Sequence, residues 1–203
     1  MIESAALGNY RLFLAISLPE EVISKLQEIQ RSLRKAVGGA QVRWTNREQL
    51  HLTMKFLGNV RVEQFPALLS AVNETCASFP PLRLTAGGIG FFPNARNPRV
   101  IWVGVEDSGS LLPKLHEEFE ARVGYFSGEE RENRFQAHVT LTRVKRMRRE
   151  EAELLAQIVR SSNADDLGSW TASHVDLIRS QLSVEGASYC IMGRAAFSAI
   201  IQQ

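Results

Sequence analysis

The sequence predicts an α+β fold of two pseudo-symmetric lobes, each a small, mostly antiparallel sheet with helices on its outer face. Two observations support this prediction. Short apolar runs typical of buried strands alternate with stripes of apolar residues at helical spacing. The same order of elements then occurs a second time along the chain. We therefore expect the two lobes to face each other across a central cleft.

The first copy of the pattern spans about residues 10–97. Its expected elements are a strand over 10–17, a helix over 22–33, a strand over 50–57, a helix over 65–72 and a strand over 82–90. Gly38 and Gly39 follow the first helix and are typical of a helix end. A stretch rich in glycine, proline and asparagine, GFFPNARNP, closes this copy as a loop.

The second copy spans about residues 98–203. Its expected elements are a strand over 99–105, a helix over 111–119, a strand over 135–144, a helix over 154–158, and closing strands over 175–184 and 189–197. Asp107 or Ser108 is the expected N-cap of the first of these helices. Glu185 and Gly186 are the expected turn between the closing strands.

The repeat keeps its spacing at two separate landmarks. His138 follows His51 by 87 positions, and Arg99 follows Arg11 by 88. This agreement favours an internal duplication, so we expect a single bilobal domain over residues 10–203, preceded by a disordered lead-in over residues 1–9. Two copies are too few for a solenoid.

Composition narrows the class of protein but does not identify its chemistry. The 203 residues are 44% hydrophobic and carry a formal net charge of +2, which excludes binding through a broad basic field and allows a local basic cleft. The two cysteines have no C-x-x-C spacing, so we expect neither a disulfide framework nor a zinc knuckle. No apolar run is long enough to span a membrane, and the first ten residues lack the basic cluster of a signal peptide. We expect a cytoplasmic monomer.

The motif His-x-Thr occurs once in each copy, as His51-Leu52-Thr53 and as His138-Val139-Thr140. Side chains alternate along a strand, so histidine and threonine at i and i+2 point to the same face. Each motif thus presents an imidazole beside a hydroxyl, and two-fold pseudo-symmetry brings both pairs to one point. Two imidazoles suit acid–base catalysis near neutral pH, and the hydroxyls can donate hydrogen bonds to phosphate oxygens.

These motifs and their flanks resemble the two-histidine phosphoesterase superfamily, and most closely its RNA 2′,3′-cyclic phosphodiesterases, also described as 2′-5′ RNA ligases. The resembling segments are RLFLAISLPEEV, VRWTNREQLHLTMKFLGNV, GGIGFFPNARNPRVIWVGV, FQAHVTLTRV and LIRSQLSVEGASYCIM. One departure is Ala137, where many relatives carry proline before the histidine.

The resemblance implies hydrolysis of RNA or oligonucleotide 2′,3′-cyclic phosphate ends to a 2′-phosphate. It assigns His51 as proton donor and His138 as proton acceptor, although the near-symmetric motifs do not themselves decide this direction. Thr53, Thr140 and Arg143 are the expected phosphate-binding residues. We expect no cofactor and no metal, because no carboxylate or cysteine lies at ligand spacing from either histidine.

Three other functions remain open at this stage. The protein is alternatively a phosphodiesterase for another small 2′-5′-linked or cyclic nucleotide, a non-catalytic module that binds RNA ends, or a ligase running the reverse reaction. The two intact histidines argue against the binding module, because binding alone does not need both imidazoles.

The remaining candidate residues have ordinary structural interpretations. His116 lies among helix charges and is expected to face solvent, and His174 has no assigned role. The basic run is expected to be a solvated helix start that can also receive RNA phosphates: Lys145, Arg146, Arg148 and Arg149. Three aromatic residues are expected to pack in the core or in loops, with Trp44 and Phe92 the best placed to stack on a base: Trp44, Phe92 and Trp102.

Overall fold

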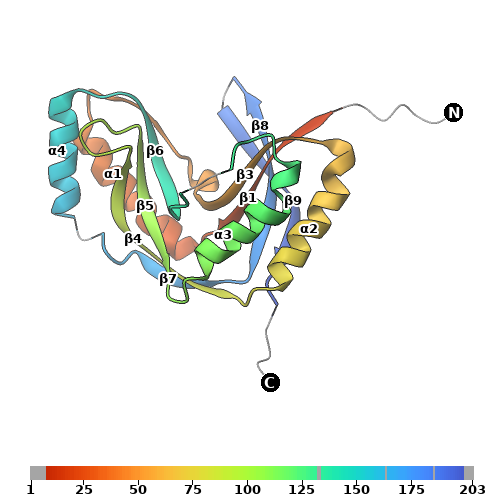
Figure 1. Cartoon of the computed structure of the whole chain (residues 1–203). Helices are drawn as coiled ribbons and strands as arrows, with labels where there is room; N and C mark the ends of the chain where they lie inside the picture. Colours follow the sequence, from red (N-terminus) through yellow and green to blue (C-terminus); the bar gives the residue numbers. More distant parts are fainter. Residues whose placement is uncertain (1–7, 132–133, 163, 185, 199–203) are drawn as a thin grey trace.

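The computed structural model describes residues 8–131, 134–162, 164–184 and 186–198. These residues form one nine-stranded sheet and four α-helices (Figure 1). The strands are β1 (Asn9–Ser17), β2 (Gln41–Trp44), β3 (His51–Arg61), β4 (Leu82–Phe92), β5 (Val100–Asp107), β6 (His138–Arg146), β7 (Gly168–Ala172), β8 (His174–Ser183) and β9 (Gly186–Ala196). The helices are α1 (Glu20–Ala36), α2 (Phe65–Ala77), α3 (Leu111–Arg122) and α4 (Arg149–Arg160), and a short 3-10 helix, η1 (Arg47–Gln49), precedes β3.

The order of the strands is pseudo-symmetric about the centre of the sheet. It runs β7-β4-β5-β6-β3-β1-β8-β9, and β2 pairs separately with β6. The two strands that carry His-x-Thr, β3 and β6, are neighbours at the centre. Beyond β6 come β5 and then β4 from the first copy, whereas beyond β3 come β1 and then β8 from the second copy. The two copies in the sequence are therefore interleaved in space.

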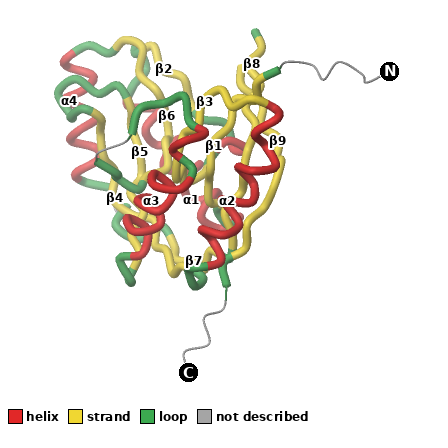
Figure 2. Tube along the Cα trace, turned by 45° about the vertical axis from the view of Figure 1, so that its right-hand side comes forward, coloured by secondary structure: helices red, strands yellow, loops and turns green. Residues whose placement is uncertain are grey.

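The molecule has two spatial halves, a first and a second lobe. The first lobe contains β1, β3, β8 and β9 with α2 and α3, and the second lobe contains β2, β4, β5, β6 and β7 with α1 and α4. Helix α2 packs against β9 and α3, while α1 packs against α4 and β7. Figures 1 and 2 place α2 and α4 at opposite sides of the molecule, with strands between them. The α+β fold class with a mostly antiparallel sheet is thus confirmed.

Several boundaries differ from the sequence prediction. Strand β1 begins at Asn9, inside the expected lead-in, and the Gly8 carbonyl accepts a hydrogen bond from Val62 N at 3.0 Å. Residues 1–7 lie outside the described residues, as does Glu185 of the expected turn. Strands β2 and β7 were not predicted, because each is short, mostly polar and partly exposed. They are strands because β6 and β4 offer them partners.

The N-cap of α3 is Ser110, not Asp107 or Ser108 as predicted, but the Asp107 side chain still contacts the start of the helix. Its carboxylate accepts hydrogen bonds from the backbone N–H groups of Gly109 and Leu112, each at 2.7 Å. The second bond satisfies a donor in the first helical turn. Ser110, the residue before the helix, has a φ of 51° and makes no side-chain cap.

A β-bulge follows each His-x-Thr motif and changes which residues face the cleft. In the pairing of β1 with β3, Ala15 is opposite Thr53 but Leu14 is opposite Lys55, so Met54 is an extra residue. In the pairing of β5 with β6, the corresponding extra residue is Leu141. A single extra residue reverses the alternation of side chains beyond it. Beyond each bulge, the side chains on the cleft face therefore belong to residues that follow the histidine by an odd number of positions.

A buried glutamine connects α1 to the second motif strand. The apolar stripe of α1, which includes Val22, Leu26 and Leu33, is buried in the core. Gln30 lies within this stripe, and its Nε2 donates hydrogen bonds to the carbonyls of Thr45 and Leu141 at 2.8 and 2.9 Å. The Leu141 carbonyl belongs to the bulge of β6, so the helix holds this irregular backbone in position.

Candidate active site

The two motifs meet where β3 and β6 pair. The strands run antiparallel, with Leu52 opposite Val139. These two residues are fully buried, so the motif side chains on either side of them lie on the other face of the sheet. The antiparallel direction brings His51 toward Thr140 and Thr53 toward His138. The two imidazoles and two hydroxyls thus alternate around one central point.

All five predicted site residues line one cleft of about 520 Å³. This volume is in the usual range for a small-molecule site. The residues that line it are Arg11, Leu12, Phe13, Arg43, Trp44, Thr45, Gln49, His51, Thr53, Phe56, Gly58, Glu129, His138, Thr140, Arg143, Ser180, Leu182, Ala187 and Tyr189. Both lobes contribute to this set, as the central-cleft prediction requires.

The two histidines are oriented by matching backbone contacts. Nδ1 of His51 lies 2.8 Å from the carbonyl of Gln49, and Nδ1 of His138 lies 2.6 Å from the carbonyl of Gln136. A carbonyl can only accept, so each Nδ1 carries the proton and Nε2 is the basic nitrogen of the neutral ring. In both copies the accepting residue is a glutamine two positions before the histidine, a sequence signal that extends the shared motif to Gln-x-His-x-Thr.

Aromatic side chains restrict the rotation of both imidazoles. The His51 ring stacks on Phe13, with centroids 4.9 Å apart, and meets the edge of Tyr189 at 5.7 Å. The His138 ring meets Phe92 edge-on at 5.1 Å and lies 5.9 Å from Trp102. Packed rings of this kind limit the imidazoles to one orientation, which acid–base chemistry requires.

The environment of His51 favours its neutral form. Burial is the largest cause, and it lowers the pKa of His51 from an ordinary 6.5 to about 4. The backbone hydrogen bond to Gln49 opposes this shift, whereas the nearby charges of His138 and Arg143 add to it. The protein therefore holds His51 uncharged at neutral pH while the cleft contains no anion.

Arginine dominates the charge of the cleft. Arg11, Arg43 and Arg143 line it, and Glu129 is the one acidic residue among the described lining residues. Arg143 reaches the cleft face only because of the bulge at Leu141, since it lies five residues after His138. The equivalent position on β3 is Phe56, whose exposed ring lines the opposite wall. Both walls thus combine cationic and aromatic side chains, with Arg11 and Phe56 on one and Arg143 and Trp44 on the other.

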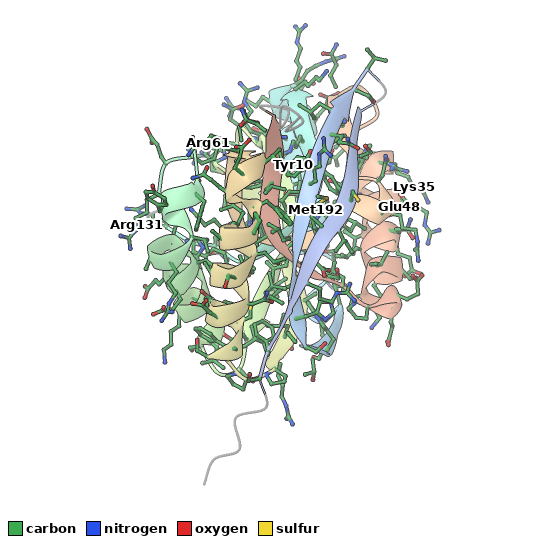
Figure 3. All side chains as sticks on the ribbon, turned by 90° about the vertical axis from the view of Figure 1, so that its right-hand side faces the viewer. Tyr10, Lys35, Glu48, Arg61, Arg131 and Met192 are labelled. Atoms are coloured by element: carbon green, nitrogen blue, oxygen red, sulfur yellow. The ribbon has the colours of Figure 1, made fainter. Side chains whose placement is uncertain are left out.

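Several lining residues were not predicted from the sequence. Gln49 supplies a carbonyl to His51, and its side-chain amide donates to the Ala187 carbonyl at the start of β9. This contact attaches the β8–β9 hairpin to the residues before β3. The hairpin runs along the molecule nearest the viewer in Figure 3, where Met192 marks β9. Tyr189 of the same strand then packs on the His51 ring.

Other predictions need correction or stay untested. His116 is buried, not solvent-facing: its Nδ1 lies 2.9 Å from the Met54 carbonyl, and its ring stacks on Phe135. It lies four residues after Leu112 and three before Phe119, on the buried face of α3. Phe92 packs on His138 and is not among the cleft-lining residues, whereas Trp44 lines the cleft.

The basic run and His174 are not among the described residues that line this cleft. The four cations of the run are exposed, as expected of a solvated helix start: Lys145, Arg146, Arg148 and Arg149. His174 is paired with Ser173 and lies near Asp176. Within the described residues, no three His, Cys, Asp or Glu side chains are grouped so as to hold a metal ion. No helix in the described part of the chain is long and apolar enough to cross a membrane.

Comparison with known proteins identifies the family. Residues 16–102 match the family model described as LigT like Phosphoesterase. The chain is 31% identical over 181 residues to the RNA 2′,3′-cyclic phosphodiesterase of Archaeoglobus fulgidus, covering 88% of this chain and 96% of the relative. The chain belongs to the LigT-like phosphoesterase family.

Other family members show the same extent of similarity. The RNA 2′,3′-cyclic phosphodiesterase of Methanothermobacter thermautotrophicus is 33% identical over 185 residues, which is 90% of this chain and 96% of that one. A solved structure from Thermus thermophilus has a TM-score of 0.73 at 28% identity, covering 92% and 97% of the two chains. E. coli LigT complexed with 3′-AMP has a TM-score of 0.71 at 24% identity, covering 94% and 99%, and shows that the fold is shared.

Proposed function

We propose that this protein is a phosphoesterase that hydrolyses 2′,3′-cyclic phosphate ends of RNA to a 2′-phosphate, without a metal ion, using His51 and His138. The observation that carries the proposal is the pairing of two oriented imidazoles with two threonine hydroxyls around one point of an arginine-lined cleft. The names of its relatives, RNA 2′,3′-cyclic phosphodiesterases, support the same substrate class. So does the 3′-AMP bound by E. coli LigT.

In the proposed reaction, Nε2 of His138 takes a proton from water as the water oxygen bonds to phosphorus. The bond from phosphorus to O3′ breaks, and His51 gives its proton to the departing O3′. The 2′-phosphate remains. The hydroxyls of Thr53 and Thr140 donate hydrogen bonds to the non-bridging oxygens, and Arg143 balances their charge. By microscopic reversibility, the same groups catalyse 2′-5′ ligation when suitable ends are concentrated.

The low pKa of His51 bears on the direction of proton transfer. A neutral imidazole is the form of a base, so His51 must gain a proton before it can act as the donor. A phosphate anion in the cleft offsets the positive charge of Arg143 and favours protonated His51. The assignment of His51 as donor and His138 as acceptor rests on the resemblance, and it requires that His51 gain a proton when the substrate binds.

Replacement of each histidine tests the pair and its direction. His51→Asn and His138→Asn should each reduce turnover of a 2′,3′-cyclic phosphate by about 10²–10⁴-fold, because each removes one proton-transfer step. A phosphodiester with a p-nitrophenolate leaving group needs no proton donor. The donor variant, His51→Asn, should therefore lose much less activity on this ester than His138→Asn.

His174→Asn is a matched control outside the cleft and should stay within about threefold of the wild type in activity. Near-normal turnover of the cyclic phosphate by both cleft variants would refute the proposed function. Rescue of His138→Asn instead of His51→Asn by the activated ester would reverse the assigned direction.

A further inference from the structure

Two cleft arginines face each other directly across a strand pair. The β2–β6 ladder places Arg43 opposite Arg143, and both side chains are exposed and line the cleft. Residues directly opposite in an antiparallel pair have Cβ atoms about 4.5–5.5 Å apart, and like charges at this separation are destabilising. The fold nevertheless holds β2 in this register, partly through a 2.9 Å hydrogen bond from Thr142 Oγ1 to the Arg43 carbonyl.

No carboxylate among the described residues neutralises this pair. None of the ion pairs within residues 8–131, 134–162, 164–184 and 186–198 involves Arg43 or Arg143. The adjacent positive charges are unbalanced while the cleft contains no anion. An anionic ligand that contacts both guanidinium groups relieves their repulsion, and arginine is well suited to phosphate because its planar fork can donate two hydrogen bonds at once.

The two arginines occupy different parts of the cleft. Arg143 is near enough to His51 to lower its pKa, which places it beside the reacting phosphate. Arg43 extends toward the β8–β9 hairpin: a Cβ atom added to Gly186 would lie 2.9 Å from Arg43 Nη2. A single cyclic phosphate at the histidines does not need a second arginine near this hairpin.

We propose that Arg43 binds the phosphodiester on the 5′ side of the terminal nucleotide, so that the enzyme selects oligonucleotide ends over nucleoside 2′,3′-cyclic phosphates. This inference rests on the proposed function. The cyclic phosphate lies between the histidines and Arg143, and the chain leaves the cleft past Arg43. Phe56 occupies the position equivalent to Arg143 on the other wall, where Arg11 of β1 is the cation that lines the cleft.

The test compares two substrates that differ by one phosphate-linked nucleoside. One is a nucleoside 2′,3′-cyclic phosphate, and the other is a dinucleotide that ends in the same cyclic nucleotide. The measured quantity is the ratio of their kcat/KM values, dinucleotide over mononucleotide. Loss of a charge-assisted hydrogen bond to phosphate weakens binding by roughly 10–100-fold. Arg43→Gln should therefore lower the kcat/KM ratio by about tenfold or more.

Two further variants separate charge from structure. Arg43→Lys keeps the charge without the fork and should restore part of the ratio. Arg160→Gln removes one exposed charge at the end of α4 and should leave the ratio as in the wild type. Raising the salt concentration should reduce the wild-type ratio more than the Arg43→Gln ratio, because the variant has lost one phosphate contact.

An Arg43→Gln ratio equal to that of the wild type, whether both substrates slow equally or neither does, would overturn the inference. Failure of the wild type to turn over either substrate would instead refute the proposed function. In that event, isothermal titration calorimetry with the mononucleotide and the dinucleotide tests whether Arg43 contacts the second phosphate. Arg43→Gln should weaken dinucleotide binding selectively, and equal weakening for both molecules would also overturn the inference.

Discussion

At the scale of single residues, the site depends on how two imidazoles are held. Each Nδ1–H is fixed by the carbonyl two residues earlier, and each ring is packed against aromatic side chains. His51 is additionally buried enough to stay neutral well below pH 7. The orientation of both rings is therefore set by the protein before a substrate binds, which reduces the reorganisation needed during reaction.

The lowered pKa of His51 predicts a dependence of stability on pH. Between the unfolded pKa of 6.5 and the folded pKa of about 4, the unfolded chain binds a proton that folded His51 does not. Stability from this residue is present above pH 6.5 and is lost as the pH falls toward 4, by at most about 3 kcal/mol. Urea unfolding of the wild type and His51→Gln at several pH values measures this effect. The wild type should lose more stability over this range, and parallel curves for the two proteins would contradict the assigned pKa.

At the scale of elements, a buried ion pair joins α3 to the first motif strand. Lys55 Nζ lies 2.7 Å from Glu120 Oε1, with both side chains almost fully buried. Lys55 follows the bulge of β3, so the helix contacts this irregular strand through a charge pair. His116 Nε2 is 3.8 Å from the same oxygen. On the second motif strand the equivalent position is Thr142, so the two copies stabilise the same irregularity with different chemistry.

A double-mutant cycle on this pair tests its role. Lys55→Met leaves a buried carboxylate without its main partner and should cost about 3–5 kcal/mol of unfolding free energy, whereas Lys55→Met with Glu120→Met should cost much less. The exposed pair Arg149–Glu153 is the matched control, and breaking it should cost less than about 1 kcal/mol. Urea denaturation measures all of these variants. A cost for Lys55→Met as small as that of the surface control would show that the buried pair does not hold α3 on β3.

At the scale of the whole molecule, the interleaved strands connect the two lobes. Strand β4 of the first copy lies in the second lobe, and β8 of the second copy lies in the first lobe. Neither copy can therefore form a complete lobe from its own strands. We propose that the chain is one cooperative folding domain, although its sequence consists of two similar units.

The positions of the tryptophans allow a direct test of this cooperativity. All three tryptophans lie in the second lobe, as Trp44 of β2, Trp102 of β5 and Trp170 of β7. Their fluorescence reports that lobe, whereas far-ultraviolet circular dichroism reports both lobes. The two signals should give the same urea midpoint if the lobes unfold together. Separate midpoints would mean that the lobes are independent domains.

The repeat in the sequence is enough to predict the fold class and the meeting of the two motifs, because both follow from strand alternation and pseudo-symmetry. Alternation alone does not place Arg143 in the cleft, since an odd distance from His138 puts it on the opposite face of a regular strand. The bulge at Leu141 turns Arg143 to the cleft face, and no local sequence signal predicts this bulge. Arg43 was missed for a related reason: β2 is a strand only because β6 pairs with it. His116 was misplaced because neighbouring charges were given more weight than its spacing from Leu112 and Phe119.

Metal-free catalysis is tested by identifying the product that the purified protein, with EDTA present, forms from an oligonucleotide that ends in a 2′,3′-cyclic phosphate. Metal-free catalysis by the two histidines predicts full conversion to a 2′-phosphate, at a rate that EDTA does not change. A 3′-phosphate product would contradict the proposed leaving group. Loss of turnover in EDTA that zinc or manganese restores would contradict the metal-free mechanism.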